Sequence, residues 1–177
     1  MHLRIAPHPS PLGTLLIVSD EQAHLRALDF DDHEANMRNG LRRLYGAVTL
    51  TPDQAPRATL QALDAYFAGE LAAIDALPVA TGGTPFQREV WAALRDIPAG
   101  RTLGYGELAA QLGRPGASRA VGLANNANPV SIVVPCHRVI GKQGALTGYG
   151  GGLPRKRWLL EHESRHTSDA PQRRLIF

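Results

Sequence analysis

Apolar residues in the first part of the chain follow two periods, one typical of strands and one typical of helices. Residues 14–18 and 25–30 are short apolar runs on either side of a polar turn, which predicts two strands. Apolar residues recur every three to four positions over 33–45, and again from Pro56 onward, which predicts two helices. We therefore assign residues 1–82 to a small α/β scaffold domain that ends in a linker.

Helical signals dominate residues 83–177. Thr84-Pro85-Phe86-Gln87 combines an N-cap, a proline at the first helical position and a capping-box glutamine. Two shorter helices, 105–112 and 117–125, are predicted around a glycine-containing turn, which favours a helix-turn-helix, although helical hairpins that bind no DNA share this pattern. A last helix is predicted from Pro154. The chain is thus expected to be α/β, with a mostly helical C-terminal domain.

A short apolar run at 131–134 predicts a strand that leads into Pro135-Cys136-His137-Arg138. Cys136 is the only cysteine of the chain. The thiolate is the reactive form of cysteine, and nearby positive charge favours it, so these neighbours indicate a reactive cysteine rather than an inert buried one. Adjacent residues on a strand point to opposite faces. His137 can therefore serve Cys136 only if the chain bends, as Pro135 would allow, or if a water carries the proton.

Composition excludes several classes of protein. The 177 residues are 44% hydrophobic, which is typical of one globular domain or two small ones. Apolar runs stay far below membrane-spanning length, and three prolines within the first eleven residues interrupt the apolar core of a signal peptide, so we expect a cytoplasmic protein with no membrane partner. A single cysteine excludes an internal disulfide and a multi-cysteine zinc site. The seven histidines lack tight ligand spacing, so we expect no metal and no cofactor.

Charge is distributed unevenly along the chain. Residues 1–82 carry six Arg or Lys and ten Asp or Glu, a balance of −4, whereas residues 83–177 carry thirteen and six, a balance of +7. Together they give the net charge of +3. A basic half favours a polyanion such as nucleic acid as its partner, although a solvated basic surface has the same composition.

The second half of the chain resembles the O6-alkylguanine-DNA alkyltransferases, also called methylated-DNA–protein-cysteine methyltransferases. The resemblance covers nearly all of residues 84–163, in order and at the family's spacing, while residues 1–82 resemble the variable N-terminal domain of the family more distantly. The matching stretches are Thr84–Gln87, Ser118–Gly122, Asn128-Pro129, Ile132–Ile140, Thr147–Leu153, Lys156 and Trp158–Glu163.

This resemblance implies an irreversible, stoichiometric transfer of an alkyl group from O6 of guanine, or less readily from O4 of thymine, in duplex DNA to Cys136. A thioether has no release step, so each molecule would act once. His137 would accept the thiol proton through a water, Glu163 would hold the imidazole, and Asn128 would brace the active-site loop. Without the resemblance, Glu163 would be interpreted as a solvated helix residue.

The resemblance also implies how DNA is bound. The target atom lies inside the base stack, so the base must be flipped out. Arg119 would fill the vacated space, and Tyr105 would crowd the phosphate and donate a hydrogen bond to the guanine. The second helix would enter the minor groove, unlike most helix-turn-helix proteins. Small side chains on that helix suit a narrow groove, and they are Ser118, Ala120 and Gly122.

Residues around the cysteine are implied to form the substrate pocket. The carbonyls of Cys136 and Val139 would accept hydrogen bonds from the guanine amino group, and Arg138, Tyr149 and Gly150 are the further substrate-binding residues expected. Gly150 stands where some members have serine, so only its N–H would contact O6. We hypothesise that this roomier pocket accepts larger alkyl groups.

Other functions compete with alkyl transfer. A lesion-binding module without chemistry would resemble family relatives that lack the cysteine, and a cysteine hydrolase would need an oxyanion site and repeated turnover. Some members bind zinc through N-terminal cysteines, which this chain lacks. We expect a monomer and leave cooperative binding to DNA open. We predict that the polar residues 164–177 fray, with docking of Leu175-Ile176-Phe177 onto the domain as the alternative.

Overall fold

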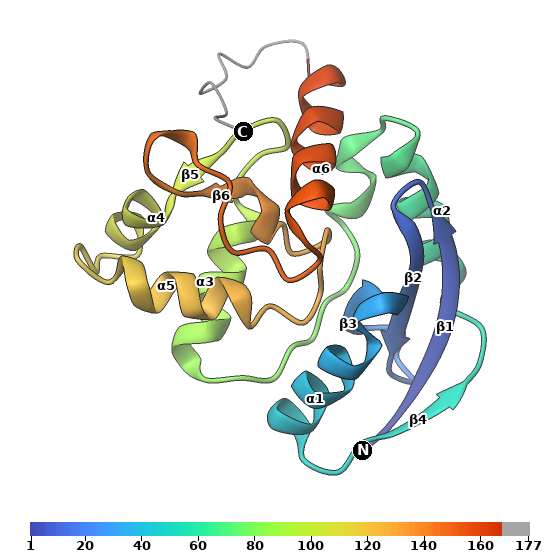
Figure 1. Ribbon diagram of the computed structural model, residues 1–177. Helices are drawn as coiled ribbons and strands as arrows, with labels where there is room; N and C mark the ends of the chain where they lie inside the picture. The colour runs from blue at the N-terminus through green and yellow to red at the C-terminus, as the bar shows by residue number, and fades with distance from the viewer. Residues whose placement is uncertain (168–177) are drawn as a thin grey trace. The chain divides into compact units, whose positions relative to one another are not determined.

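The structure, a computed structural model, describes residues 1–167 (Figure 1). These residues form two compact units. The first consists of Met1–Gly83 with Pro129–Val133, and the second of Thr84–Asn128 with the described residues from Val134 onward. A sheet forms in the first unit and helices dominate the second, which confirms the predicted α/β class. The fraying predicted for residues 164–177 is wrong for the first four of them, because the last helix, Leu153–Arg165, includes two of them and the Thr167 hydroxyl donates to the Glu163 carbonyl at 2.9 Å. From position 168 on, this prediction lies outside the described residues.

A four-stranded sheet, in the order β3-β2-β1-β4, forms the centre of the first unit. Its strands are β1 (His2–Ser10), β2 (Gly13–Ser19), β3 (Leu25–Phe30) and β4 (Thr49–Pro52). β2 pairs antiparallel with β1 and β3, and β4 pairs parallel with β1. Strands β2 and β3 are the two that the apolar runs predict.

Strand β1 is not predicted by the sequence pattern, because Pro7 and Pro9 interrupt it. Proline cannot donate to a ladder and is found in edge strands or where pairing stops. Both prolines pair with β2, but β4 pairs only with His2–Ile5. The prolines therefore lie beyond the part of β1 that has a strand on each side.

Helix α1 (Glu34–Tyr45) packs on one face of this sheet. It places Met37 and Leu41 in a buried cluster with apolar residues of three strands, Leu3, Leu16, Val18 and Ala27. Helix α2 (Arg57–Phe67) buries Leu63 and Tyr66. Both predicted helices are confirmed, and the predicted linker contains a short 3₁₀ helix, Leu71–Ile74.

Helices and one short pair of strands make up the second unit. They are α3 (Pro85–Arg95), β5 (Leu103–Gly104), α4 (Tyr105–Gln111), α5 (Ser118–Asn126), β6 (Val139–Ile140) and α6 (Leu153–Arg165). The capping box of α3 is formed, since the Gln87 N–H donates to the Thr84 hydroxyl at 3.2 Å and the Thr84 N–H donates to the Gln87 side chain at 2.9 Å. Helices α4 and α5 pack against each other, and the parallel pair β5–β6 joins the segment before α4 to the segment after Arg138.

The prediction of a strand at 131–134 is wrong. This segment is a turn in which Ile132 has a φ of 71°, and Pro129–Val133 belongs to the first unit. The Leu28 N–H donates to the Pro129 carbonyl at 2.9 Å and the Ser131 N–H donates to the Leu28 carbonyl at 2.8 Å. The run is apolar because it is buried in a turn, and an apolar run alone does not distinguish such a turn from a buried strand.

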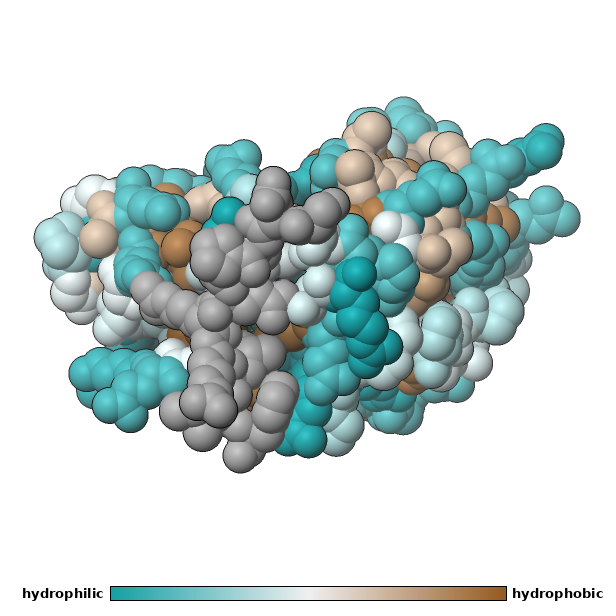
Figure 2. Space-filling view, turned by 90° about the horizontal axis from the view of Figure 1, so that it is seen from above, coloured by the Kyte–Doolittle hydropathy of each residue, from teal (hydrophilic) through white to brown (hydrophobic). Residues whose placement is uncertain are grey.

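Polar side chains make up much of the described surface on the face shown in Figure 2. Hydrophobic residues are visible between them (Figure 2). Across residues 1–167, no helix combines the length and the apolar character that crossing a membrane requires. The exposed large hydrophobic residues of the described chain are Met1, Leu123 and Leu153.

Candidate active site

The cysteine lies in a sharp bend. Pro135 has φ −82° and ψ 66°, and Cys136–Arg138 forms a single 3₁₀ turn instead of continuing an extended chain. Successive side chains of such a turn are rotated by about 120°, rather than to opposite faces as on a strand. The bend that the adjacency of Cys136 and His137 requires is thus present. Cys136 is only 6% exposed and His137 is fully buried.

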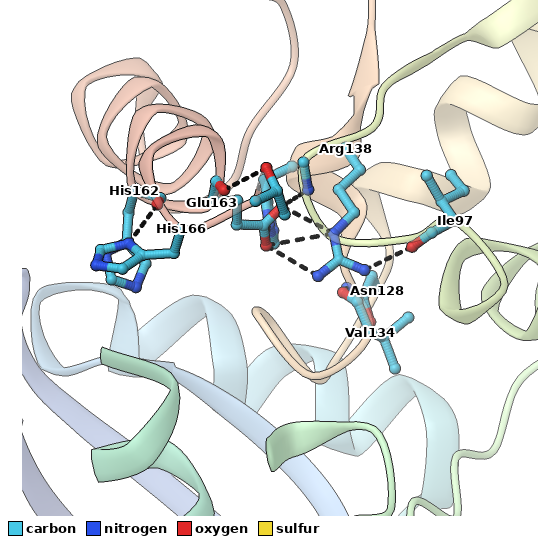
Figure 3. A network of polar contacts seen from close by, with 10 residues as sticks. Ile97, Asn128, Val134, Arg138, His162, Glu163 and His166 are labelled. Atoms are coloured by element: carbon cyan, nitrogen blue, oxygen red, sulfur yellow. Dashed lines mark hydrogen bonds and ion pairs between the residues drawn. The ribbon is translucent and has the colours of Figure 1, made fainter. Parts of the chain in front are cut away.

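His137 and Arg138 both contact the carboxylate of Glu163 from α6. Figure 3 shows the contact of Arg138 with Glu163. His137 Nε2 lies 2.7 Å from Glu163 Oε1. Arg138 donates from Nε to Oε2 at 3.0 Å and from Nη2 to Oε1 at 2.9 Å, and its Nη1 donates to the Ile97 carbonyl at 2.6 Å. The Gly100 N–H adds a donor to Oε2 at 3.2 Å. The carboxylate is therefore held by donors on both oxygens.

Arg138 is predicted from the sequence to bind substrate, and its position in the structure points to another role. The side chain is almost completely buried, and its guanidinium is directed at Glu163 and the Ile97 carbonyl (Figure 3). The reason is the 3₁₀ turn Cys136–Arg138, which directs its third residue into the core. We therefore assign Arg138 a positioning role toward Glu163.

Charges in this network favour a neutral imidazole next to an ionised carboxylate. Burial opposes ionisation of Glu163, but the hydrogen bonds of His137 and Arg138 and the charge of Arg138 outweigh it and hold the pKa of Glu163 far below its usual range. Burial lowers the pKa of His137, and it outweighs the attraction of Glu163. Arg138 supplies the positive charge that neutralises the buried carboxylate, so His137 need not be protonated.

The neutral imidazole must donate through Nε2, because an ionised carboxylate can only accept. Its Nδ1 then carries a lone pair. Among the residues that the structure describes, Nδ1 of His137 has no hydrogen-bond partner, although it is buried. An imidazole whose far nitrogen is fixed by a carboxylate and whose near nitrogen can take up a proton is the arrangement of a general base.

Two asparagines at the end of α5 hold the bend. Asn128 donates from Nδ2 to the Val134 carbonyl at 2.8 Å, which places this residue against the active-site loop (Figure 3). Asn125 donates to the Cys136 carbonyl at 3.4 Å and is buried, and sequence reasoning missed it. Asn125 lies within α5 and Asn128 lies two residues past its end, so helical spacing gave no signal that could have found Asn125.

Lys156, in the first turn of α6, is a second residue that sequence reasoning assigned no role. It is fully buried, and its Nζ donates to the Val139 carbonyl at 2.6 Å and to the Thr147 carbonyl at 2.8 Å. Burial lowers the pKa of Lys156 to about 8, opposed by a charge interaction with Cys136. The ammonium thus joins two loop segments near the sulfur, and it occupies one of the two lone pairs of the Val139 carbonyl, which is expected to bind guanine.

Tyr105 begins α4, and its hydroxyl donates to the Thr147 carbonyl at 3.3 Å. Burial raises the pKa of Tyr105, and the charge interaction with Cys136 adds to this. The phenol is therefore a protonated donor at neutral pH. Tyr149 is buried, and a Cβ added to the next residue, Gly150, would meet no atom within 4 Å, so there is space beside that glycine.

A groove of about 780 Å³ runs between α4, α5 and the segment 141–148. Four of the predicted DNA-contacting residues line it, and they are Tyr105, Ser118, Arg119 and Gly122. Ala120 is exposed on α5 but does not line this groove. Tyr105 lies close to Gly122, where an added Cβ would be 3.7 Å from the ring. Within residues 1–167, no cluster of three or more metal-ligating side chains occurs.

The fold and the site together define a two-unit α/β protein with a buried cysteine, a carboxylate-held imidazole in the same turn and a groove beside a helix pair. Comparison with known families agrees with this class. The family model "6-O-methylguanine DNA methyltransferase, ribonuclease-like domain" matches residues 4–81, and "6-O-methylguanine DNA methyltransferase, DNA binding domain" matches residues 85–165. The chain belongs to the methylated-DNA–protein-cysteine methyltransferase family, which performs DNA repair by alkyl transfer.

Individual relatives are similar over most of their length. The methylated-DNA–protein-cysteine methyltransferase of Salmonella typhimurium is 57% identical over 159 residues, which cover 87% of this chain and 91% of the relative. The enzyme of the same name from Mycolicibacterium paratuberculosis is 47% identical over 162 residues, covering 89% and 90%. A crystal structure of Mycobacterium tuberculosis OGT in complex with DNA superposes with a TM-score of 0.77 at 44% identity, over 94% of each chain.

Proposed function

We propose that this protein repairs alkylated duplex DNA by moving the alkyl group from O6 of guanine, or more slowly from O4 of thymine, onto Cys136. The observation that carries the proposal is the buried Nδ1 of His137, whose ring is fixed by Glu163 at 2.7 Å in the turn that holds the cysteine. Such a base has a use only if a neighbouring group loses a proton, and the thiol is the neighbouring nucleophile.

The transfer proceeds in balanced steps. The Cys136 thiol gives its proton to Nδ1 of His137 through a water, and the thiolate attacks the alkyl carbon. The S–C bond forms as the C–O6 bond breaks, and the electron pair of the broken bond stays on the guanine, which takes up a proton to become the normal base. The Tyr105 hydroxyl donates a hydrogen bond to the guanine and stabilises the charge that develops there. Lys156 favours the thiolate by its charge.

The product determines the turnover number. A thioether is stable in water, and the chain contains no second thiol that could regenerate Cys136. Each molecule therefore acts once, and the alkylated protein is a final product. This property separates the proposal from a cysteine hydrolase, which would release its product and react again.

DNA is proposed to lie along the groove beside α5, with that helix in the minor groove. Arg119 enters the stack where the target base has left it, and Ser118, Ala120 and Gly122 allow the close approach of the helix backbone. The flipped base is bound by the carbonyls of Cys136 and Val139, by Tyr149 and by the N–H of Gly150. The open space at Gly150 supports the acceptance of alkyl groups larger than methyl.

The remaining assignments are also proposals. Residues 1–82 act as a scaffold, and residues 83–177 bind DNA and carry out the transfer. We propose a cytoplasmic monomer that needs no cofactor, and cooperative binding to DNA stays open. The excess of basic residues in the second half supports phosphate contacts, so affinity for DNA should fall as salt rises.

Mass spectrometry after incubation with a duplex that contains O6-methylguanine tests the proposal. One CH₂ should be added per molecule, on the peptide that contains Cys136, and none should be added to Cys136→Ser. The same duplex with O4-methylthymine should react more slowly. Tight binding without any mass change would instead identify a lesion-binding module, and repeated turnover of an ester would identify a hydrolase.

A further inference from the structure

Leu123 is the most exposed large hydrophobic residue of the described chain. Its side chain is 68% exposed, although it belongs to α5, a helix whose buried face is formed by Val121, Ala124 and Asn125. Exposed leucines are common singly, so exposure alone decides nothing. The position of Leu123 relative to Arg119 provides the second observation that the inference needs.

Leu123 lies four residues after Arg119, and side chains at this spacing lie on one face of a helix. Both residues line the groove of about 780 Å³, together with Ser118, Gly122 and Asn126 of the same helix. Ser118 and Gly122 are small. Arg119 and Leu123 are therefore the two large side chains that α5 presents to the groove, about 6 Å apart along the helix axis.

We infer that Leu123 is an apolar contact to the minor groove, which packs on the deoxyribose and base edges of nucleotides about two positions from the flipped one. This inference rests on the proposed function. With α5 along the groove, a separation of about 6 Å corresponds to roughly two base pairs from Arg119. Minor-groove proteins use apolar side chains as wedges that unstack neighbouring steps and bend the duplex. Leu123 thus helps to open the duplex at the site that Arg119 fills.

Duplex DNA is favoured over a protein partner as the occupant by the chemistry of the groove. Arg119 and Lys142 place positive charge on its two sides, and the one carboxylate in the lining, Glu107, accepts a hydrogen bond from the Gly104 N–H at 2.6 Å. The unit that contains the groove has a strongly basic composition. A protein partner would be expected to cover a broader apolar patch, whereas the neighbours of Leu123 on this face are Arg119, Gly122 and Asn126. One apolar side chain among a cation and small or polar residues suits a narrow polyanionic groove.

Binding of Leu123→Ala to a duplex that contains O6-methylguanine, measured across a range of salt concentrations in a Cys136→Ser background, tests the inference. Affinity should fall roughly five- to tenfold, as expected for the loss of a few buried carbon atoms. The slope of log affinity against log salt should not change, because an apolar group releases no counterions. Arg119→Ala, in contrast, should reduce the slope by about one.

Leu153→Ala is the matched control, because Leu153 is also exposed, at 44%, and does not line the groove. It should bind as tightly as the parent protein. Leu123→Ala with Cys136 intact should transfer an alkyl group from the free base at the parental rate. Unchanged affinity of Leu123→Ala, a changed salt slope, or an equal loss in Leu153→Ala would each overturn the inference.

The inference and the proposed function fail in different ways. If the parent protein leaves Cys136 unmodified but Leu123→Ala loses affinity at constant salt slope, the DNA contact stands and the alkyl transfer is refuted. If the parent protein is alkylated at Cys136 but Leu123→Ala binds the duplex with parental affinity, the contact is refuted and the transfer stands.

Discussion

The two units of the molecule bury different kinds of side chain. In the described residues of the first unit, the core is apolar, and Asp20 is the one buried charged group. In the described residues of the second unit, five basic or acidic side chains are buried, and they are His137, Arg138, Lys156, His162 and Glu163. Buried charges are unfavourable unless they are paired. The core of the first unit is thus explained by stability. The buried charged side chains of the second unit are not required for stability, which points to a role in chemistry.

Glu163→Gln should have the largest effect, because it removes the negative charge from the buried charged groups of the second unit. The neutral amide leaves the Arg138 charge buried without its carboxylate and no longer fixes the His137 ring, so transfer to Cys136 should slow by about 100-fold or more. The thermal midpoint should also fall. Single-turnover kinetics by mass spectrometry would measure the first effect and calorimetry the second.

Glu161→Gln is the matched control, because Glu161 lies on the same helix and pairs with Arg165 at the surface. Surface ion pairs contribute about 0 to 1 kcal/mol. This variant should react and unfold like the parent protein, and a loss comparable to that of Glu163→Gln would show that α6, rather than the network, is sensitive.

Lys156→Met should have the next largest effect. Methionine keeps the volume but removes the charge near Cys136 and both loop hydrogen bonds, so transfer should slow by roughly tenfold. Arg157→Met, at the exposed neighbouring position, should leave the rate unchanged. Equal rates for Lys156→Met and the parent would mean that the buried ammonium has no part in the chemistry.

The same residue predicts a pH dependence of stability. The pKa of Lys156 is about 8 in the folded protein, and in the unfolded chain it returns to the ordinary lysine value of 10.5. Between these values the unfolded chain binds more protons than the folded protein. Lys156 therefore contributes an increase in the free energy of unfolding as pH rises from about 8 to 10.5. Denaturant titrations should show this contribution in the parent and not in Lys156→Met.

Gly150→Ser should have a smaller effect that depends on the substrate. An added Cβ has open space, so the fold should be unaffected. Transfer of a methyl group should change little, whereas benzyl transfer should slow by a few-fold because the hydroxymethyl group occupies the space. Rates across methyl, ethyl and benzyl substrates would measure this, and a uniform change across the series would contradict a role in alkyl size.

Leu41→Ala should have the smallest effect on transfer. It removes a core side chain of the first unit and should lower the free energy of unfolding by about 2–5 kcal/mol. The transfer rate per folded molecule should stay the same, because the buried charges lie in the other unit. A lower transfer rate under conditions where the variant is fully folded would show that the core of the first unit affects the reaction as well as stability.

Sequence predicts the elements whose signals are local. Periodicity and caps locate the helices, and the Pro-Cys-His-Arg motif with its surroundings locates the reactive bend. Strand β1 is not predicted because it contains Pro7 and Pro9. A strand can contain these prolines only because β4 pairs with its earlier residues and not with them, and the sequence does not show where that pairing ends. The segment 131–134 is assigned wrongly because burial, not strand pairing, makes it apolar.

The site is predictable only in part, for a related reason. A sequence shows which residues are charged but not which of them are buried. Arg138 is therefore expected at the substrate and Lys156 is given no role, whereas the fold places both inside, one against Glu163 and one against two loop carbonyls. Asn125 is likewise defined by its contact with Cys136, which only the fold creates.

The protonation of His137 near neutral pH is the most direct test of the central claim, that Glu163 and Arg138 keep a neutral base beside Cys136. Nitrogen NMR of the ring reports it. We predict a protonated Nε2 and an unprotonated Nδ1, with the neutral ring persisting below the usual titration range of histidine because burial lowers its pKa. A ring that carries protons on both nitrogens at neutral pH would contradict the account.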